Sequence, residues 1–128
     1  MGDDTMVQAL GSWGEEQAVR FLLRNGYRVI ERNFRVWEGE IDVITERDGR
    51  IVFVEVKTRS SDLFGSPEES LSSRKQIRLY RAGCRYLELK SLLDKPFQFD
   101  LIAIECTPSR QIERFTHYED IVCLDSLE

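Results

Sequence analysis

Three ionisable side chains interrupt the two most hydrophobic strand-like segments of this sequence. Asp42 lies in one segment, and Glu55 and Lys57 lie in the next, beyond an Asp48-Gly49 turn. Unpaired charges are costly inside strands, so their presence there indicates a use for them. Two carboxylates can bind a hard divalent cation, and a lysine can stabilise the charge that develops on a phosphate. The residue types therefore predict metal-dependent chemistry on a phosphodiester.

The hairpin predicted around the Asp-Gly turn brings the two carboxylates together. Counting outward from a two-residue turn sets Asp42 directly opposite Glu55, with Cβ atoms about 5 Å apart. The same count sets Glu40 opposite Lys57, whereas a three-residue loop would separate the acids onto opposite faces. Two carboxylates this close repel unless a cation lies between them or one takes a proton. We therefore expect Mg²⁺ or Mn²⁺ at this point, with the main-chain carbonyl of Val56 as a further ligand.

The same charges have a simpler interpretation, which the sequence leaves open. Glu40 and Lys57 would then form a cross-strand surface ion pair worth roughly 0–1 kcal/mol. The acids at positions 42 and 55 would lie near solvent, and the chain would be a structural protein. A hairpin register that separates the two acids would favour this interpretation.

A third acid is predicted on the first helix, which we expect over residues 7–25. A helical wheel at about 100° per residue places Glu15 inside the apolar arc, which makes it a further candidate metal ligand. Glu16 falls at the edge of that arc, four residues before Arg20, and is predicted to form a surface salt bridge with it. The alternative for Glu15 is a position near the helix start, where the helix dipole favours acids.

The second long helix, expected over residues 74–93, carries the candidate DNA contacts. Its buried face is predicted to consist of four residues at helical spacing: Ile77, Tyr80, Cys84 and Leu87. A neighbouring stripe of four arginines consists of candidate nucleic-acid contacts: Arg74, Arg78, Arg81 and Arg85. Lys75 and Gln76 beside the stripe, and Arg59 at the expected substrate entrance, are further candidates. A solvated helix face is the alternative interpretation of the stripe.

Residue counts bound the class of protein. The 128 residues, 41% hydrophobic and 32% charged, predict one globular domain over residues 1–128 with its core at about 7–118. There is no membrane-length apolar run and no signal pattern, and the odd number of cysteines favours a reducing cytoplasm. The net charge of −5 argues against strong non-specific nucleic-acid binding without excluding a local basic surface. His117 is the only histidine and is predicted to be structural, and Asp100 is a second-tier acid on an apolar strand.

The expected elements form an α/β fold. Five strands accompany the two helices, at residues 27–35, 41–46, 51–57, 97–105 and 111–118. In the loop expected over residues 58–73, Ser66-Pro67-Glu68-Glu69 has the form of a capping box and predicts one helical turn. Because both faces of the central strands are apolar, the simplest packing is a mixed central sheet flanked by a helix on each face.

Several motifs together resemble the YraN-like family of small bacterial proteins. The match runs from about residue 11 to about residue 105 and consists of Gly14-Glu15…Ala18, Asn33-Phe34-Arg35, Gly39-Glu40-Ile41-Asp42, residues 52–59 and Arg74-Lys75-Gln76. That family is similar to the restriction-endonuclease-like superfamily of PD-(D/E)xK nucleases, which includes archaeal Holliday-junction resolvases. One departure from the superfamily pattern is that Ile41, not proline, precedes the first acid.

The resemblance implies an αβββαβ core with a metal-dependent DNA-cleaving site. Asp42 and Glu55 match the metal-binding acids, Lys57 the catalytic lysine, and Glu15 the first-helix acid of resolvase-like members. Gln76 with Tyr80 is similar to the Gln-x-x-x-Tyr element of RecB-like nucleases.

The leading hypothesis is a Mg²⁺- or Mn²⁺-dependent DNA endonuclease that acts on branched or flapped DNA in repair or recombination. Resolvase-like enzymes cut two strands symmetrically, which also favours a homodimer. The rival hypothesis is a nucleic-acid-binding or assembly protein that keeps the nuclease fold without turnover. Metal binding that depends on Asp42 and Glu55 separates the two.

Overall fold

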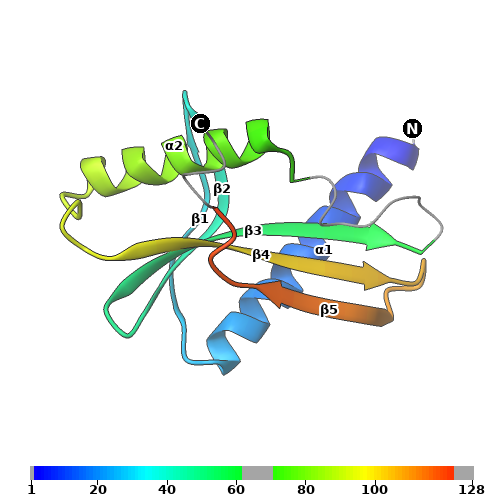
Figure 1. Cartoon of the computed structure of the whole chain (residues 1–128). Helices are drawn as coiled ribbons and strands as arrows, with labels where there is room; N and C mark the ends of the chain where they lie inside the picture. Colours follow the sequence, from blue (N-terminus) through cyan, green and yellow to red (C-terminus); the bar gives the residue numbers. More distant parts are fainter. Residues whose placement is uncertain (1, 62–70, 123–128) are drawn as a thin grey trace.

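The computed structural model describes residues 2–61 and 71–122, with side chains described from Leu10 onward. The elements in chain order are α1 (Gly2–Arg24), β1 (Arg28–Val36), β2 (Gly39–Arg47), β3 (Arg50–Ser60), α2 (Ser73–Leu89), β4 (Phe97–Cys106) and β5 (Ile112–Tyr118) (Figure 1). This is the expected order, although α1 begins earlier and α2 ends earlier than the sequence pattern indicated. The predicted capping-box turn lies outside the described residues.

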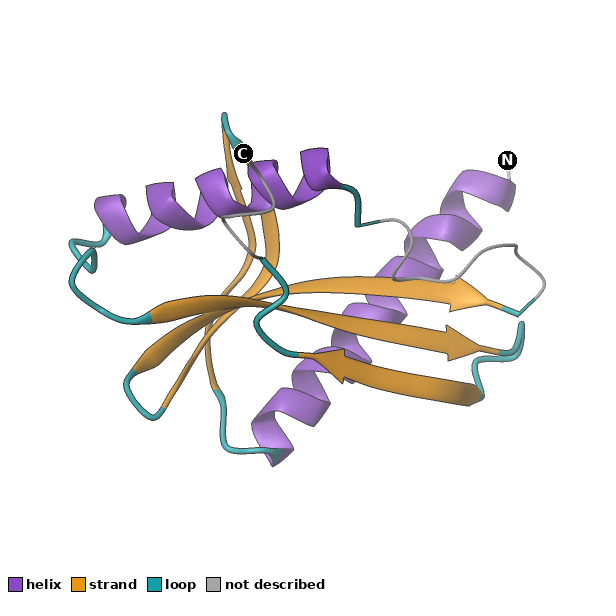
Figure 2. Ribbon diagram, in the orientation of Figure 1, coloured by secondary structure: helices purple, strands orange, loops and turns teal. Residues whose placement is uncertain are grey.

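The strands form one mixed sheet in the order β1-β2-β3-β4-β5. Strand β3 pairs with β4 in parallel, and the other neighbours are antiparallel. Helix α1 packs through Ala18 and Leu22 on one face, and α2 packs through Ala82 and Tyr86 on the other (Figure 2). The predicted α/β fold with a helix on each face of a mixed sheet is confirmed. Within the described part of the chain, neither helix is apolar enough to cross a membrane.

The predicted β2–β3 hairpin is confirmed near its turn. Asp48 and Gly49 both have positive φ values, 52° and 77°, which is the conformation of a two-residue hairpin turn of type I′. Arg47 therefore pairs with Arg50, as counted from the sequence. The ladder continues in register only as far as the pair of Val43 with Val54.

Beyond the pair of Val43 with Val54, strand β2 separates from β3. The cross-strand pair predicted between Asp42 and Glu55 is therefore not formed in the ladder. Residues two apart on a regular strand share a face, yet Ile41 packs in the core on the α2 side and Val43 in the core on the α1 side. Asn33 of the neighbouring strand β1 has a positive φ of 54° at the same level. The β1–β2 hairpin thus twists at Asp42 and rises beside α2 (Figure 1).

The buried face of α2 differs from the prediction. Compared with the predicted residues, those that face the sheet are mostly smaller or lie at other positions of the helix: Leu79, Ala82, Gly83, Tyr86 and Leu87. Among the four predicted residues, only Leu87 is fully buried, and the others are half-buried. A Cβ atom on Gly83 would lie 2.5 Å from Cζ of Phe99, so the helix approaches the sheet through its smallest residues. The large apolar side chains that predict a buried face instead flank this contact line.

Candidate functional site

Asp42 lies where β2 separates from β3, and there its carboxylate replaces a missing strand partner. Its Oδ2 atom accepts a hydrogen bond of 2.8 Å from the backbone N–H of Val56. The Glu55 side chain, of which 16% is exposed, forms a hydrogen bond with Asp42. The predicted meeting of the two acids is therefore confirmed, but it results from divergence of the strands and not from a continued ladder.

The Glu55 carboxyl group is protonated at neutral pH in the metal-free protein. Burial is the main reason that the pKa of Glu55 is raised to about 9, and the hydrogen bond and the charge of Asp42 raise it further. Lys57 and Lys75 lower the pKa in part. The distance of 3.8 Å between Nζ of Lys57 and Oε2 of Glu55 is too long for a hydrogen bond, so this contact offsets only a fraction of the burial cost. At neutral pH Glu55 therefore holds a proton.

Glu15 approaches the same pair from α1. Burial raises the pKa of Glu15, and the negative charge of Asp42 is the next largest cause. The approach depends on Gly14, because a Cβ atom there would lie 1.8 Å from Oγ1 of Thr58 on β3. Helix α1 therefore lies close against β3 one residue before Glu15, which agrees with the core-facing position expected from the helical wheel.

Glu16 is half-exposed, as expected, but its predicted partner is wrong. Its Oε2 atom lies 3.3 Å from Nη1 of Arg32 on β1, and no ion pair with Arg20 is formed among the described residues. The helical wheel considers only neighbours on the same helix, so it could not identify an arginine on the adjoining strand.

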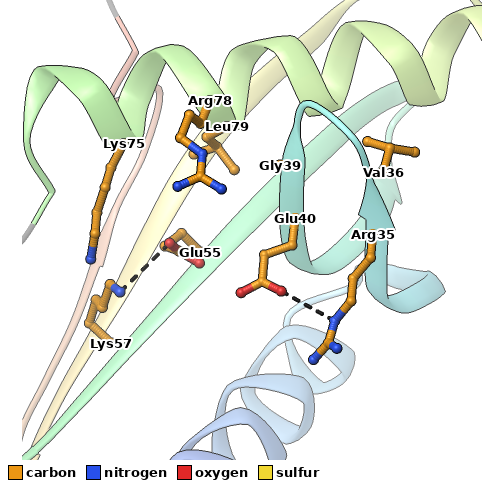
Figure 3. Close-up of a pocket in the computed structure, with 9 residues that line it drawn as sticks. All are labelled: Arg35, Val36, Gly39, Glu40, Glu55, Lys57, Lys75, Arg78 and Leu79. Carbon is orange, nitrogen blue, oxygen red and sulfur yellow. Dashed lines mark ion pairs between the residues drawn. The ribbon is translucent and has the colours of Figure 1, made fainter.

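A cavity of about 280 Å³ opens beside the acids, between α2, β3 and the β1–β2 hairpin (Figure 3). Its lining combines acids, bases and apolar residues: Arg35, Val36, Gly39, Glu40, Glu55, Lys57, Lys75, Arg78 and Leu79. Glu40 pairs with Arg35 across the hairpin, with Nε and Oε2 3.2 Å apart. The alternative ion pair between Glu40 and Lys57 is therefore wrong. Lys57 instead projects towards Glu55 and Lys75 (Figure 3).

The donor set at Asp42 and Glu55 fits a hexacoordinate Mg²⁺ or Mn²⁺ ion better than a closed structural metal site. Among the described residues, no cluster of three Asp, Glu, His or Cys side chains is close enough to hold an ion. Mg²⁺ requires fewer protein ligands, because it keeps several waters and is commonly bound by one or two carboxylates. In an extended strand the N–H and C=O groups of one residue point to the same side, so the Val56 carbonyl also faces Asp42. The carboxylates of Asp42 and Glu55 and the main-chain carbonyl of Val56 are the groups that would hold the ion.

The predicted nucleic-acid contacts separate into two groups. Lys75 and Arg78 line the cavity, and the close approach of the Lys57 ammonium group lowers the pKa of Lys75. Arg59 on β3 lies near enough to Lys75 to lower that pKa further. At the first turn of α2, Arg74 is exposed. Gln76 is not among the residues that line the cavity.

Gln76 donates a hydrogen bond of 3.3 Å to the carbonyl of Leu71, which accounts for its position. Arg81 and Arg85 line a different cavity, further along α2. Arg85 is already engaged by two carboxylates, with 3.5 Å to Glu38 and 2.8 Å to Glu88. The stripe is therefore continuous on the helix, but only its first part reaches the acids.

The buried partnership of Asp100 and His117 was missed by sequence reasoning. Asp100 is fully buried on β4, and its Oδ2 atom lies 2.7 Å from Nε2 of His117 on β5. Oδ1 of Asp100 accepts hydrogen bonds of 2.9 Å from the Gln98 side chain and from the Asp120 backbone. The histidine is structural, as expected. Its partner was not predictable, because the connection over residues 107–111 contains a turn at Pro108 but no two-residue hairpin signal that fixes the register of the two strands.

The chain is similar to a group of curated bacterial proteins. The sequence profile described as uncharacterised protein family UPF0102 matches residues 14–104. A UPF0102 protein of Syntrophomonas wolfei is 46% identical over 99 residues, covering 77% of this chain and 86% of the relative. A second, from Moorella thermoacetica, is 44% identical over 94 residues, covering 73% and 78%.

A solved structure, that of Pyrococcus furiosus SfsA in complex with Ca²⁺, is a more distant match. It has a TM-score of 0.40 and 19% sequence identity, and the alignment covers 88% of this chain but only 63% of that protein. A likeness at this level carries no argument about function. The family match is of a different strength, because it spans most of the chain and includes Gly14 and the acids at positions 15, 42 and 55. The YraN-like resemblance is thereby confirmed, and the chain belongs to the uncharacterised protein family UPF0102.

Proposed function

We propose that this protein hydrolyses phosphodiester bonds in DNA with Mg²⁺ or Mn²⁺, and that its substrates are branched or flapped forms. The observation that supports this most is the direct contact of the Asp42 and Glu55 carboxyl groups beside Lys57. Glu55 keeps its proton at neutral pH beside Asp42, and a divalent cation would replace that proton. Asp42 also serves the fold by accepting the Val56 N–H, whereas a hydrophobic residue in place of Glu55 would avoid the desolvation cost of a buried carboxyl group.

Each residue has a separate role in the proposed reaction. Asp42, Glu55 and the Val56 carbonyl would hold the ion, and Glu15 would accept a hydrogen bond from a water in its hydration shell. When bound, the ion offsets negative charge on the scissile phosphate. The Lys57 ammonium group would orient the attacking water and stabilise charge as the phosphate is attacked. Lys75 and Arg78, at the cavity wall on α2, would bind a phosphate of the same strand.

The proposal is tested with purified protein and three substrates: supercoiled plasmid, single-stranded DNA and a four-way junction. We expect cleavage in Mg²⁺ or Mn²⁺ but not in EDTA, and we expect Glu55→Gln and Lys57→Ala to abolish it. Glu113→Gln, which changes an exposed acid on β5, is the matched control and should cleave as the wild type does. Cleavage that survives both site variants would come from another protein and would overturn the proposal.

Metal binding is measured in parallel by calorimetric titration with Mn²⁺. We expect binding to the wild type and none to Asp42→Asn. DNA binding without metal binding or cleavage would support the rival function, a binding or assembly module. Symmetric cutting of two strands also requires two sites, so we propose that the active species on junctions is a homodimer, which sedimentation of the protein–junction complex would show.

A further inference from the structure

An exposed tryptophan lies at the tip of the β1–β2 hairpin, whose flanking residues line the cavity. Trp37 lies in the two-residue connection between β1 and β2, and 98% of its surface is exposed. The residues on either side of the connection, Val36 and Gly39, pair with each other and both line the cavity. Tryptophan is on average a highly buried residue, so a fully exposed ring beside a candidate site indicates contact with a ligand.

The hairpin tip that carries Trp37 is held firmly against α2. A Cβ atom at Gly39 would lie 2.9 Å from the backbone oxygen of Arg78, so the tip approaches the helix backbone closely. Glu38 turns inward, and its Oε2 atom lies 3.5 Å from Nε of Arg85. The two residues after Trp37 are therefore fixed on the helix, while the indole ring is presented outward. A ring held in this way loses little conformational entropy when a ligand covers it.

The surroundings of Trp37 favour a nucleobase over a protein surface as its ligand. Protein interfaces have a contiguous apolar core. Among the other exposed large apolar residues described, Leu93 alone lines a cavity together with a tip residue, Glu38, and the rest lie on α1, α2 and β5: Leu23, Leu89 and Ile112. The α2 side of the cavity wall carries two bases, Lys75 and Arg78, and Gly39, two residues after Trp37, approaches the α2 backbone at Arg78. In the described part of the chain, no ion pair joins either of these bases to an acid. A cationic wall next to a single aromatic ring is the combination that binds a nucleotide strand, with phosphate on the bases and base on the ring.

We infer that Trp37 is a stacking platform for an unpaired nucleobase whose neighbouring phosphate lies in the cavity. This inference rests on the proposed function, and it specifies the substrate further. Both faces of a base inside a duplex are already covered by its neighbours, so only an unpaired or terminal base offers a free face. The substrate strand is therefore single-stranded where it passes the hairpin tip, as in a flap, a gap or the branch point of a junction.

The test compares two labelled strands of equal length and charge: oligothymidine and a fully abasic strand. Binding is measured by fluorescence anisotropy in Ca²⁺, and cleavage of the flapped substrate is measured in Mg²⁺ and Mn²⁺. We expect Trp37→Ala to weaken oligothymidine binding by about 5- to 100-fold, the usual contribution of one stacked base, and to leave binding of the abasic strand unchanged. Trp37→Tyr should restore most of the affinity.

Ile112→Ala is the matched control, because it removes an exposed apolar side chain from β5 at the opposite edge of the sheet. It should leave both affinities unchanged. Equal losses on the two strands, or no loss on either, would overturn the stacking inference. Circular dichroism of each variant establishes that a loss is not caused by unfolding.

The outcomes separate the inference from the proposed function. Metal-dependent cleavage together with oligothymidine binding that is the same in the wild type and in Trp37→Ala would overturn only the inference. Base binding that depends on Trp37, without cleavage in either metal, would overturn only the proposed hydrolysis. Absence of DNA binding by the wild type would overturn both.

Discussion

Gly14 of α1 and Thr58 of β3 are in such close contact that no side chain can be placed at Gly14. A Cβ atom there would lie 1.8 Å from Oγ1 and 2.8 Å from Cβ of Thr58. Because the Thr58 Cβ atom is fixed by its backbone, rotation of the threonine side chain cannot relieve the clash. The contact sets the distance of α1 from the sheet one residue before Glu15.

Gly14→Ala is therefore expected to destabilise the protein by about 1–3 kcal/mol, as overpacking does, and to weaken metal binding by moving Glu15 away from Asp42. Urea unfolding and Mn²⁺ titration measure the two effects. Gly11→Ala is the matched control on the same helix, where the added methyl group meets nothing within 4 Å. It should stabilise the helix by up to about 1 kcal/mol. Equal stabilities of the two variants would contradict the prediction.

The raised pKa of Glu55 predicts a specific dependence of stability on pH in the metal-free protein. The folded state holds the Glu55 proton up to about pH 9, whereas the unfolded chain releases it near 4.5. The stabilising contribution of this proton is complete below the unfolded pKa and is lost as the pH rises through the folded pKa. The free energy of unfolding should therefore fall between about pH 5 and pH 9.

Glu55→Gln mimics the protonated acid and should remove this dependence. We expect the variant to match the wild type near pH 5 and to be more stable near pH 9, by on the order of a few kcal/mol. Denaturant unfolding in EDTA at a series of pH values measures the effect. Glu113→Gln on β5 serves as the control and should keep the wild-type profile. Parallel pH profiles of Glu55→Gln and the wild type would disprove the assignment of the proton to Glu55.

The division of the basic stripe on α2 predicts unequal effects on DNA binding. Lys75→Ala and Arg78→Ala should each weaken binding and reduce the slope of log K against log salt by about 0.7–0.9, the contribution of one phosphate contact. Arg85→Ala should change neither, because Glu38 and Glu88 already engage that guanidinium group. Anisotropy titrations at several salt concentrations measure the slopes. An Arg85→Ala effect as large as that of Arg78→Ala would show that DNA follows the whole helix.

Asp100 is predicted to support the fold and not the site. Asp100→Ala leaves His117, the Gln98 amide and the Asp120 backbone N–H without their shared acceptor. We expect a loss of about 3–5 kcal/mol in thermal unfolding, with metal affinity unchanged in the fraction that stays folded. Asp94→Ala, which removes an exposed acid, is the control and should have little effect. A loss of metal affinity in folded Asp100→Ala would place this residue in the site after all.

Local patterns predicted the elements of this fold well, because each element carries its own signal. Alternation and the Asp48-Gly49 turn define the β2–β3 hairpin, and the register near the turn follows from them directly. The ladder could not be extrapolated to Asp42, since its end depends on the twist of β1–β2 around Asn33 and on packing against α2. The acids meet nonetheless, through a side chain that replaces a backbone partner.

Tertiary partners were not predictable to the same extent. Glu16 binds Arg32 of another element, and Arg85 binds Glu38 of the hairpin tip, so a helical wheel could not identify either contact. The same limit applies to Trp37, whose exposure depends on how the tip meets α2. An aromatic residue in a hairpin connection is the signal that would have drawn attention to it.

The position of Asp42, Glu55 and Lys57 within one hairpin has a consequence for folding kinetics. Only a short stretch of chain must close to pair β2 with β3 near the turn, whereas the parallel pairing of β3 with β4 requires the crossover through α2. The two carboxyl groups meet beyond the end of the β2–β3 ladder, where their positions depend on the twist of β1–β2 and on packing against α2. We therefore expect their contact to form late in folding, so that a proton or a cation at this position slows unfolding more than it accelerates folding.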